Sequence, residues 1–219
     1  MDSIKIKDLF DLSHTLLSEY LSKFEYPFEA LPGIKDEIIR VGNTLDLNEY
    51  NLVKENVWVH KTAKVFESAY LGSPLIVCEN AEIRHCAFIR GSAVVGKNAV
   101  VGNSVELKNV ILFDNVQTPH YNYVGDSILG FKAHMGAGSI TSNVKSDKTL
   151  VVIKGEEEYK TNLKKVGAFL GDFVEVGCNS VLNPGSVVGR NSNVYPLSSV
   201  RGVVKANTIY KQGKQVLKY

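Results

Sequence analysis

The sequence has few of the features that define several large classes of protein. Among its 219 residues, 25 basic side chains stand against 23 acidic ones, so the formal net charge is only +2. Such a weak field holds a polyanion poorly, which argues against nucleic acid as a partner. No stretch approaches the roughly 18 apolar residues of a membrane span, and the first residues lack the apolar core of a secretory signal. We therefore expect a cytoplasmic protein that binds neither nucleic acid nor membrane.

Cysteine is also scarce. Cys78, Cys86 and Cys178 form no C-x-x-C pair, and their odd number favours reduced thiols over a disulfide framework. The length of the chain suits one domain with an appendage, or two small domains.

A period of six residues runs through most of the chain. Between positions 59 and 113, every sixth residue is large and apolar: Val59, Val65, Leu71, Val77, Ile83, Ile89, Val95, Val101, Leu107 and Phe113. The phase slips by one residue near 118–126, and a last run extends from Leu170 to Val200. A period of six fits neither a helix nor a long strand, so each hexad should form a short strand and a turn.

Repeats of this length predict an all-β solenoid, in which each coil pairs its backbone with the next. Residues 57–204 should form it, with about nineteen hexads. The pattern resembles that of hexapeptide-repeat proteins, whose parallel β-helix winds left-handed with three hexads in each triangular coil, which implies roughly six coils here. The left hand is taken from this resemblance, because crossovers between parallel strands are ordinarily right-handed.

Three segments lie outside the repeat. Residues 1–56 should form a helical N-terminal cap over the open first coil, with an amphipathic helix in 3–24 and a second short helix near Ile34 and Ile38. Residues 142–167 read as an inserted, solvated loop rich in lysine, and 205–219 as a C-terminal tail. A long loop on a rigid scaffold suggests function.

The phase slip is the strongest candidate for a functional segment. Its residues 118–126 read TPHYNYVGD, a polar and aromatic run where the apolar column is disturbed. It contains His120, and histidine in general suits proton transfer near neutral pH. The alternative is an ordinary hydrogen-bonded surface histidine.

The stretch from Gly102 to Thr141 resembles the acetyltransferase half of the bifunctional glucosamine-1-phosphate acetyltransferase and N-acetylglucosamine-1-phosphate uridyltransferase enzymes. It is more similar still to the C-terminal domain of archaeal sugar-1-phosphate nucleotidyltransferases with amino-sugar acetyltransferase activity. The resemblance rests on the run V-E-L-K, His120 twelve residues later, then Tyr-x-Gly-Asp and Gly-Ala-Gly. It implies transfer of acetyl from acetyl-CoA to the amine of an amino-sugar 1-phosphate of the glucosamine or galactosamine type.

The resemblance also implies roles for single residues near the acceptor. His120 would be the general base, and Arg90 and Lys108, one coil apart, would hold the sugar phosphate. Tyr123 would contact the sugar, and Lys148 would reach it from the following loop.

Further residues correspond to the cofactor side or depart from the pattern. Asn143 would lie near the acetyl group, and Cys178 and Pro196 beside coenzyme A. His134 would line the sugar site, but it stands where bacterial members have asparagine, and Val144 stands where they have tyrosine. These two differences leave the identity of the amino sugar open.

The resemblance further implies homotrimers, with each site between neighbouring prisms and the 142–167 loop reaching across. No metal is required. Residues 1–56 contain only Gly33 and Gly42, without the glycine-rich nucleotide loop of the bifunctional relatives, so we expect no uridyltransferase activity.

Two other functions remain open. One is a non-catalytic hexapeptide scaffold that binds sugar phosphates. The other is a gamma-type carbonic anhydrase, in which three histidines hold zinc. His85 and His120 have a suitable long spacing, but the second member of the close histidine pair is missing.

Overall fold

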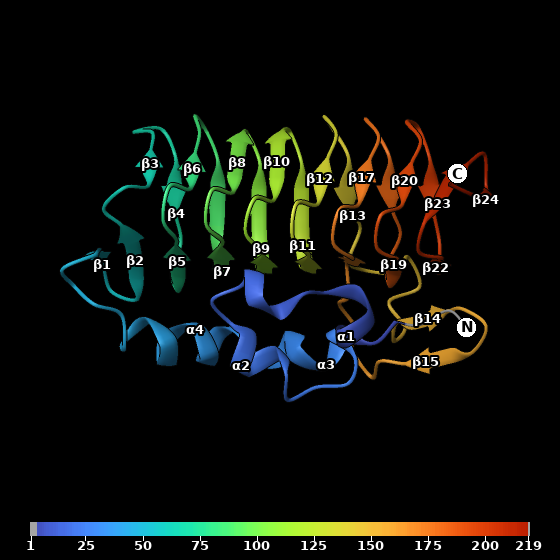
Figure 1. Ribbon diagram of the computed structural model, residues 1–219, viewed down its shortest axis with the longest axis horizontal. Coiled ribbons are helices and arrows are strands. Elements are labelled where there is room, and N and C mark those ends of the chain that lie inside the picture. Colours follow the sequence, from blue (N-terminus) through green and yellow to red (C-terminus); the bar gives the residue numbers. More distant parts are fainter. Residues whose placement is uncertain (1–3, 219) are drawn as a thin grey trace.

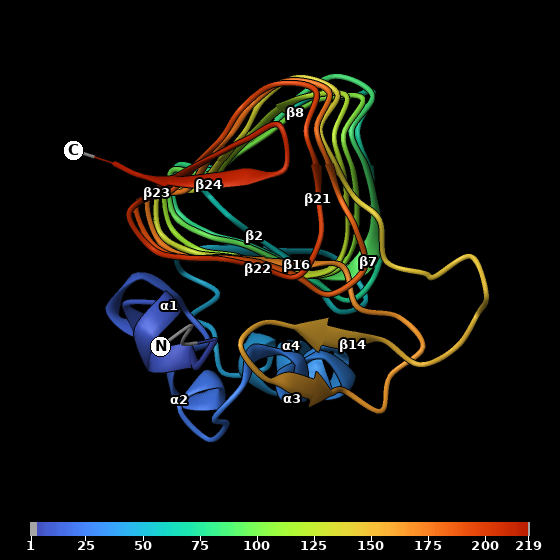
Figure 2. The ribbon, with the colours of Figure 1, turned by 90° about the vertical axis from the view of Figure 1, so that its right-hand side faces the viewer.

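The computed structural model describes residues 4–218. Its repeat region is a left-handed parallel β-helix with three flat faces (Figures 1 and 2). In Figure 2 the chain advances toward the viewer while it runs clockwise, up the left face, down the right face and back along the bottom, which defines the left hand. The predicted fold class is therefore confirmed.

We number the faces in the order of the chain. Face 1, at the bottom of Figure 2, contains β2 (Val57–His60), β5 (Leu75–Val77), the second halves of β7 (Phe88–Val95), β9 (Glu106–Leu112) and β11 (Tyr123–Leu129), then β16 (Ala168–Leu170), β19 (Ser186–Val188) and β22 (Val203–Val204). Face 2 contains β3 (Lys64–Val65), β6 (Glu82–Ile83), β8 (Val100–Asn103), β10 (Gln117–His120), β12 (His134–Met135), β17 (Glu175–Val176), β20 (Asn193–Val194) and β23 (Thr208–Lys211). Face 3 contains β4 (Tyr70–Leu71), the first halves of β7, β9 and β11, then β13 (Ile140–Thr141), β18 (Val181–Leu182) and β21 (Ser199–Val200).

The ladder is longer than the sequence predicted. Eight strands stack on face 1 within residues 4–218, where the hexad count gave about six coils. One missed hexad contains Thr118, a fully buried polar residue that pairs with Val101 in the inward column. The last coil also continues to the buried Tyr210. A count of apolar residues misses the hexad of Thr118, because threonine is polar. The predicted run also ended at Val200, before Tyr210.

The inward column of the hexads forms the core. Eight of the ten predicted large residues between positions 59 and 113 are buried, while Val65 and Leu71 are half-buried because they belong to the first coil. Each fully buried aliphatic side chain contributes about 1.5–3 kcal/mol. Burial of this column therefore supplies most of the free energy that stabilises the stacked coils.

The N-terminal helices correct one prediction. They are α1 (Ile6–Leu9), η1 (Leu12–His14), α2 (Ser18–Leu21), α3 (Pro27–Ala30), η2 (Leu31–Gly33) and α4 (Ile34–Gly42). Instead of capping the first coil, they lie side by side along face 1 (Figures 1 and 2). Phe10 packs on Phe113 with ring centroids 5.2 Å apart, and His14 stacks on Phe131 at 3.6 Å. Apolar side chains on the outer side of face 1 give the helices this longer surface to cover.

The helix expected in 3–24 is broken into short turns, and its residue 3 lies outside the described part. Phe10 has extended backbone that ends α1, because the next residue turns toward the solenoid. The second predicted helix is confirmed as α4, with Ile34 and Ile38 fully buried. No helix in residues 4–218 has the length and apolar character needed to cross a bilayer.

Antiparallel strands close both ends of the ladder. β1 (Tyr50–Lys54) pairs with β2, and β24 (Lys214–Leu217) pairs with β23. The segment expected as a C-terminal tail thus contains two strands, although Tyr219 lies outside the described residues. The β1–β2 pair shields the edge of the first coil, which the helices were predicted to cover, and the β23–β24 pair shields the opposite edge.

The insertion is more ordered than the expected solvated loop. It contains the hairpin of β14 (Val152–Lys154) and β15 (Glu158–Lys160), with Val151 and Ile153 fully buried. Tyr159 packs on Tyr26, with ring centroids 5.3 Å apart, so the hairpin extends the helical layer beside face 1 (Figure 2). Residues 146–150 and the hairpin tip 154–158 are continuously exposed, whereas Val151 and Ile153 pack back on the solenoid.

A buried carboxylate fastens the helical layer to the solenoid. Asp172 Oδ2 accepts the backbone N–H of Asp11 at 2.7 Å and pairs with Arg190 at 2.8 Å, while Oδ1 accepts the N–H of Phe131 at 2.8 Å. The backbone N–H of Asp172 donates to Leu9. Burial raises the pKa of this carboxyl, and its hydrogen-bond donors oppose that rise.

We predict that Asp172→Ala lowers the free energy of unfolding by about 2–4 kcal/mol, because it leaves two backbone N–H groups and Arg190 without their acceptor. Urea unfolding followed by circular dichroism measures the change. Glu158→Ala is the control, since it removes an exposed carboxylate 4.0 Å from Lys154 and should change the midpoint little. An Asp172→Ala midpoint equal to that of the control would contradict the prediction.

Candidate functional site

Faces 2 and 3 meet at an edge to which each coil contributes one residue. We call it the His120 edge, and from the second coil on its members are His85, Asn103, His120, Ala137, Cys178 and Pro196. The carbonyl of each of the first five accepts a backbone N–H from the coil that follows, at 2.8–3.1 Å. Strands in successive coils are about 4.8 Å apart. Cys178 therefore lies two coils from His120, and Pro196 three.

A buried amide sets the turn at His120. The side chain of His120 is exposed at the end of β10, and Tyr121 follows with a left-handed φ of 51°. Asn122 is buried, and its Oδ1 accepts the N–H of His120 at 3.2 Å. Its Nδ2 donates to the carbonyls of Gly136 and Ser139 at 2.9 and 3.0 Å. This amide locks the chain so that the imidazole faces outward.

A second buried carboxylate organises the opposite edge of face 3, at the corner where β11 turns onto face 1. The side chain of Asp126 is 5% exposed and accepts from Lys108 Nζ at 2.8 and 3.0 Å. It also accepts from the side-chain amides of Asn109 at 3.0 Å and Asn143 at 2.6 Å. The Asn143 amide lies 3.1 Å from the Tyr123 hydroxyl, to which it donates. We call Lys108, Tyr123, Asp126 and Asn143 the Asp126 cluster.

The ring of Tyr123 depends on a glycine. A Cβ on Gly125 would lie 2.5 Å from the Tyr123 hydroxyl and 2.9 Å from Asn143 Nδ2, so a larger residue would displace both. Burial raises the pKa of Tyr123, the hydrogen bond from Asn143 opposes the rise, and the nearby negative charge of Asp126 adds to it. The hydroxyl therefore remains a neutral group that can donate or accept a hydrogen bond.

Arg90 lies on the same face as Lys108, one coil earlier. The register pairs Gly91 with Lys108, so Arg90 precedes the position opposite the lysine. Its Nη1 donates to Glu106 at 3.0 Å, and its side chain is 49% exposed. The structure thus brings the two predicted cations together, while their role with a phosphate stays a prediction.

A cleft of about 480 Å³ lies on face 2 beside the His120 edge. It is lined by Cys178 and Pro196, and also by His134, whose Nδ1 is 2.7 Å from Glu175 Oε2. The grouping expected from sequence therefore changes. His134 belongs to β12 on face 2 and joins the predicted cofactor residues, whereas Asn143 follows face 3 and joins the predicted sugar residues.

Lys148 is not brought to these groups. It lies in the exposed stretch 146–150 with a left-handed φ of 56°. Its neighbour Lys145 pairs with Asp147 at 3.4 Å instead of reaching the solenoid. Within residues 4–218, no hydrogen bond or ion pair joins Lys148 to the Asp126 cluster. Its expected contact with substrate stays a prediction.

Several polar residues of the site were not assigned from sequence, above all Asp126 and Asn122. Asp126 has a left-handed φ of 48°, as Asn109 does one coil earlier at 55°. Asparagine and aspartate are the non-glycine residues that favour this conformation. The recurrence of asparagine or aspartate at this corner predicts the turn. It does not predict which side chains contact the Asp126 carboxylate.

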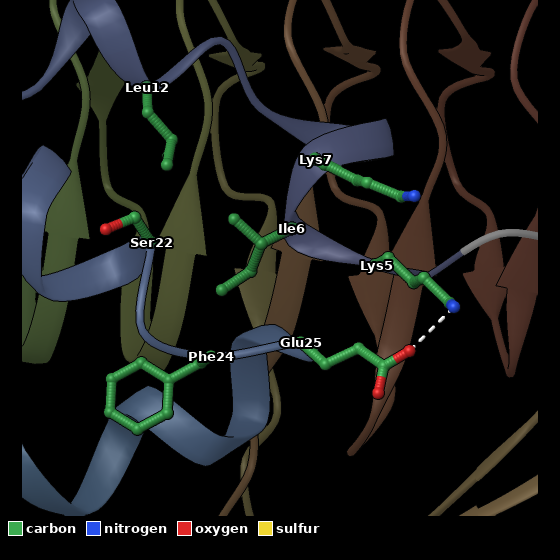
Figure 3. A pocket seen from close by; sticks show the side chains of 7 residues that line it. All are labelled: Lys5, Ile6, Lys7, Leu12, Ser22, Phe24 and Glu25. Atoms are coloured by element: carbon green, nitrogen blue, oxygen red, sulfur yellow. Dashed lines mark ion pairs between the residues drawn. The ribbon is translucent and has the colours of Figure 1, made fainter.

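Two further cavities lie elsewhere. One, of about 580 Å³, lies between the β14–β15 hairpin and the end of face 3, and its charged lining consists of Lys145, Lys154, Arg201 and Glu158. We call it the basic cleft. The other, of about 360 Å³, lies in the N-terminal segment, where Lys5 pairs with Glu25 at 2.6 Å (Figure 3). It is lined by none of the predicted site residues.

The described residues offer no ligand set for a metal. In residues 4–218, no three histidine, cysteine, aspartate or glutamate side chains are grouped as a metal ion would need. The carbonic anhydrase alternative, which requires three histidines, therefore gains no support from the geometry.

Comparisons with known proteins agree with this architecture. Residues 71–183, more than half of the chain, match the family described as GMPPB C-terminal domain. The bifunctional protein GlmU of Methanococcus aeolicus is 31% identical over 207 residues, covering 86% of this chain and 50% of the relative. The bifunctional sugar-1-phosphate nucleotidylyltransferase/acetyltransferase of Sulfurisphaera tokodaii is 26% identical, covering 80% and 44%. The chain thus spans about half the length of these relatives.

Among solved structures, the acetyltransferase domain of PglB from Neisseria gonorrhoeae FA1090 in complex with acetyl coenzyme A is 12% identical, with a TM-score of 0.33. The match covers 80% of this chain and 63% of that one, a likeness too weak to carry an argument. The assignment to a family rests instead on the family match and the curated relatives. The chain belongs to the family of the GMPPB C-terminal domain, and it is similar in sequence to the bifunctional sugar-1-phosphate nucleotidylyltransferase/acetyltransferases.

Proposed function

We propose that the chain transfers an acetyl group from acetyl-CoA to the amine of an amino-sugar 1-phosphate, with His120 as the general base. One observation carries the proposal. His120 is on the edge between two faces, with the Asp126 cluster on face 3 and the cleft containing Cys178 and Pro196 on face 2. An acceptor on one side and a donor on the other would meet at the imidazole.

The groups on face 3 suit a phosphorylated sugar. Arg90 uses Nη1 for Glu106 and keeps further N–H donors for phosphate oxygens. Lys108 is held beside it by a buried carboxylate and remains partly exposed. The hydroxyl of Tyr123 and the amide of Asn143 provide neutral hydrogen-bonding groups for sugar hydroxyls.

The face 2 cleft suits the long arm of coenzyme A. Its lining includes Gly136, Gly177, Cys178 and Pro196, which lie on the His120 edge or next to it. A Cβ on Gly177 would lie 2.4 Å from Pro196 N, so glycine keeps successive coils close there. When bound, acetyl-CoA supplies the activated thioester.

The chemistry needs one proton acceptor and a fixed geometry. The acceptor nitrogen forms a bond to the acetyl carbon, the carbon–sulfur bond breaks, and the sulfur leaves as the thiol of coenzyme A. His120 accepts the proton that the nitrogen loses and can return it to the leaving sulfur. General base catalysis of this kind contributes about 10²–10⁴ in rate, and positioning by the Asp126 cluster contributes further.

We predict that His120→Ala lowers kcat for thiol release by about 10²–10⁴ with glucosamine 1-phosphate or galactosamine 1-phosphate as acceptor. The release of coenzyme A is measured with a thiol reagent that absorbs visible light.

His85→Ala is the matched control for this variant, because His85 occupies the same edge two coils earlier and packs on Phe66 with tilted rings. It should leave kcat unchanged. Turnover by His120→Ala at the wild-type rate would reject the base. Binding of acetyl-CoA by wild type without thiol release on any amino-sugar phosphate would instead favour the non-catalytic scaffold.

We also predict that acetyl-CoA protects Cys178 from alkylation but does not protect Cys86. Both thiols are exposed beside or on the His120 edge, Cys178 two coils after His120 and Cys86 next to His85, two coils before it. Cys78 should not react in either case, because burial raises its pKa to about 12. Mass spectrometry of the labelled peptides measures each site. Equal protection of Cys86 and Cys178 would contradict a donor path along the cleft.

The site should be completed in a homotrimer, with residues 142–150 of one copy reaching the face of its neighbour. Lys148 has no partner group on its own solenoid that would explain its predicted role, whereas this stretch extends away from the prism (Figure 2). Light scattering is expected to give three times the mass of one chain. A monomeric mass would remove this part of the proposal.

A further inference from the structure

Face 3 continues beyond the proposed sugar site with two exposed aromatic rings. The register stacks Tyr70, Phe88, Glu106 and Tyr123 in successive coils of this face. Tyr70 is 56% and Phe88 43% exposed, and their ring centroids are 5.4 Å apart. The core of the solenoid does not need these rings, because the inward positions between them are filled by Leu71 and Ile89.

Cations accompany the rings. Lys54 Nζ lies 4.9 Å from the centroid of the Tyr70 ring. Arg90 follows Phe88 at the next outward position of β7, about 6.6 Å along the strand. Lys108 lies one coil closer to Tyr123. Along the face toward the N-terminal coils, Tyr123 is thus followed by Lys108 and Glu106 in one coil, by Arg90 and Phe88 in the next, and by Tyr70 with Lys54 beside it.

From these observations we infer that the acceptor is a nucleoside diphosphate-linked amino sugar, whose base stacks on Phe88 and Tyr70 while Arg90 and Lys108 hold its diphosphate. This inference rests on the proposed function and extends its acceptor from a sugar 1-phosphate to a nucleotide sugar. Three coils, roughly 14 Å, separate Tyr70 from Tyr123. A diphosphate and a ribose can bridge such a length.

The direction of the acceptor also follows from the edge. The cleft for the donor extends from His120 toward the C-terminal coils, through Cys178 and Pro196. An acceptor that leaves the imidazole on face 3 toward the N-terminal coils avoids the donor. In the C-terminal direction the outward positions are Ile140, Val181 and Ser199, which offer no aromatic ring.

The basic cleft is the competing anion site. Lys145, Lys154 and Arg201 line it, yet Lys145 is paired with Asp147 and Lys154 lies near Glu158. It contains cations without a surface on which a base could stack. Nucleotide binding there would depend on Arg201 and be indifferent to Phe88, so the two sites are separable by substitution.

Calorimetry with UDP, GDP and pyrophosphate tests the inference without turnover. Wild type should bind UDP or GDP roughly tenfold or more tightly than pyrophosphate, since stacking on aromatic rings adds to the phosphate contacts. Phe88→Ala should remove that advantage, and Phe88→Tyr should keep it. Phe173→Ala is the matched control, because its ring is 41% exposed with Lys132 Nζ 5.9 Å from the centroid, at a different corner.

Several outcomes would overturn the inference. They are equal binding of UDP, GDP and pyrophosphate by wild type, unchanged UDP and GDP binding by Phe88→Ala, and loss of nucleotide binding in Arg201→Ala with Phe88→Ala unaffected. A Phe88→Ala variant with a changed oligomeric mass would assign the rings to a contact between copies and would overturn it too.

A turnover assay separates this inference from the proposed function. The value of kcat/KM with UDP-glucosamine or GDP-glucosamine should exceed that with glucosamine 1-phosphate. A preference for glucosamine 1-phosphate rejects the nucleotide acceptor and leaves the proposed function standing. Absence of acetyl transfer to these three acceptors and to galactosamine 1-phosphate rejects the proposed function itself.

Discussion

The hydrogen-bonded register between successive coils determines where every functional group lies. Each coil can shift against its neighbour only in steps that would expose an inward residue such as Leu107 or Val124, and burial of the apolar column opposes such a shift. Residues 17 or 18 positions apart in sequence therefore become neighbours about 4.8 Å apart. Arg90 and Lys108, or His120 and Ala137, lie beside each other for this reason alone.

The register leaves one electrostatic problem, which the Asp126 cluster solves. A buried carboxylate is costly unless it has a cation and hydrogen-bond donors. Asp126 has one lysine and two asparagine amides around it, which come from the coil before it and the coil after it. The interaction orients Lys108 and Asn143 before any ligand arrives, so less conformational entropy is lost on binding. The interactions of Asp126 at this corner thus position Lys108 and Asn143 for a ligand.

The sequence predicted the parts of the structure that follow a strict period. The inward residues follow from counting sixes, whereas the three-faced coil was implied by the resemblance to hexapeptide-repeat proteins. Given that coil, the spacing of eighteen places Arg90 next to Lys108. It failed where polar residues replace apolar ones, as Thr118 does in the column. It also failed for the docking of the helices, because the partners Asp11 and Asp172 are 161 residues apart and no local pattern connects them.

The site was predicted less completely than the fold, for a related reason. Single residues such as His120 and Tyr123 could be carried over from a resemblance, but their partners depend on which face each strand joins. His134 and Asn143 exchanged groups because β12 belongs to face 2 while Asn143 leaves the end of face 3. The number of residues between a position and His120 does not predict its face, because faces 2 and 3 lie on either side of the same edge.

The chain's own packing explains why the chemistry is proposed at the His120 edge and not at another. The N-terminal helices cover face 1, and the β14–β15 hairpin extends this helical layer (Figure 2). Faces 2 and 3 are therefore the faces along which a long substrate can bind. These two faces share the His120 edge. Two long substrates can approach that edge from opposite ends, one along each face, and touch at a single coil. The imidazole of His120 belongs to that coil, between the cleft on face 2 and the Asp126 cluster on face 3.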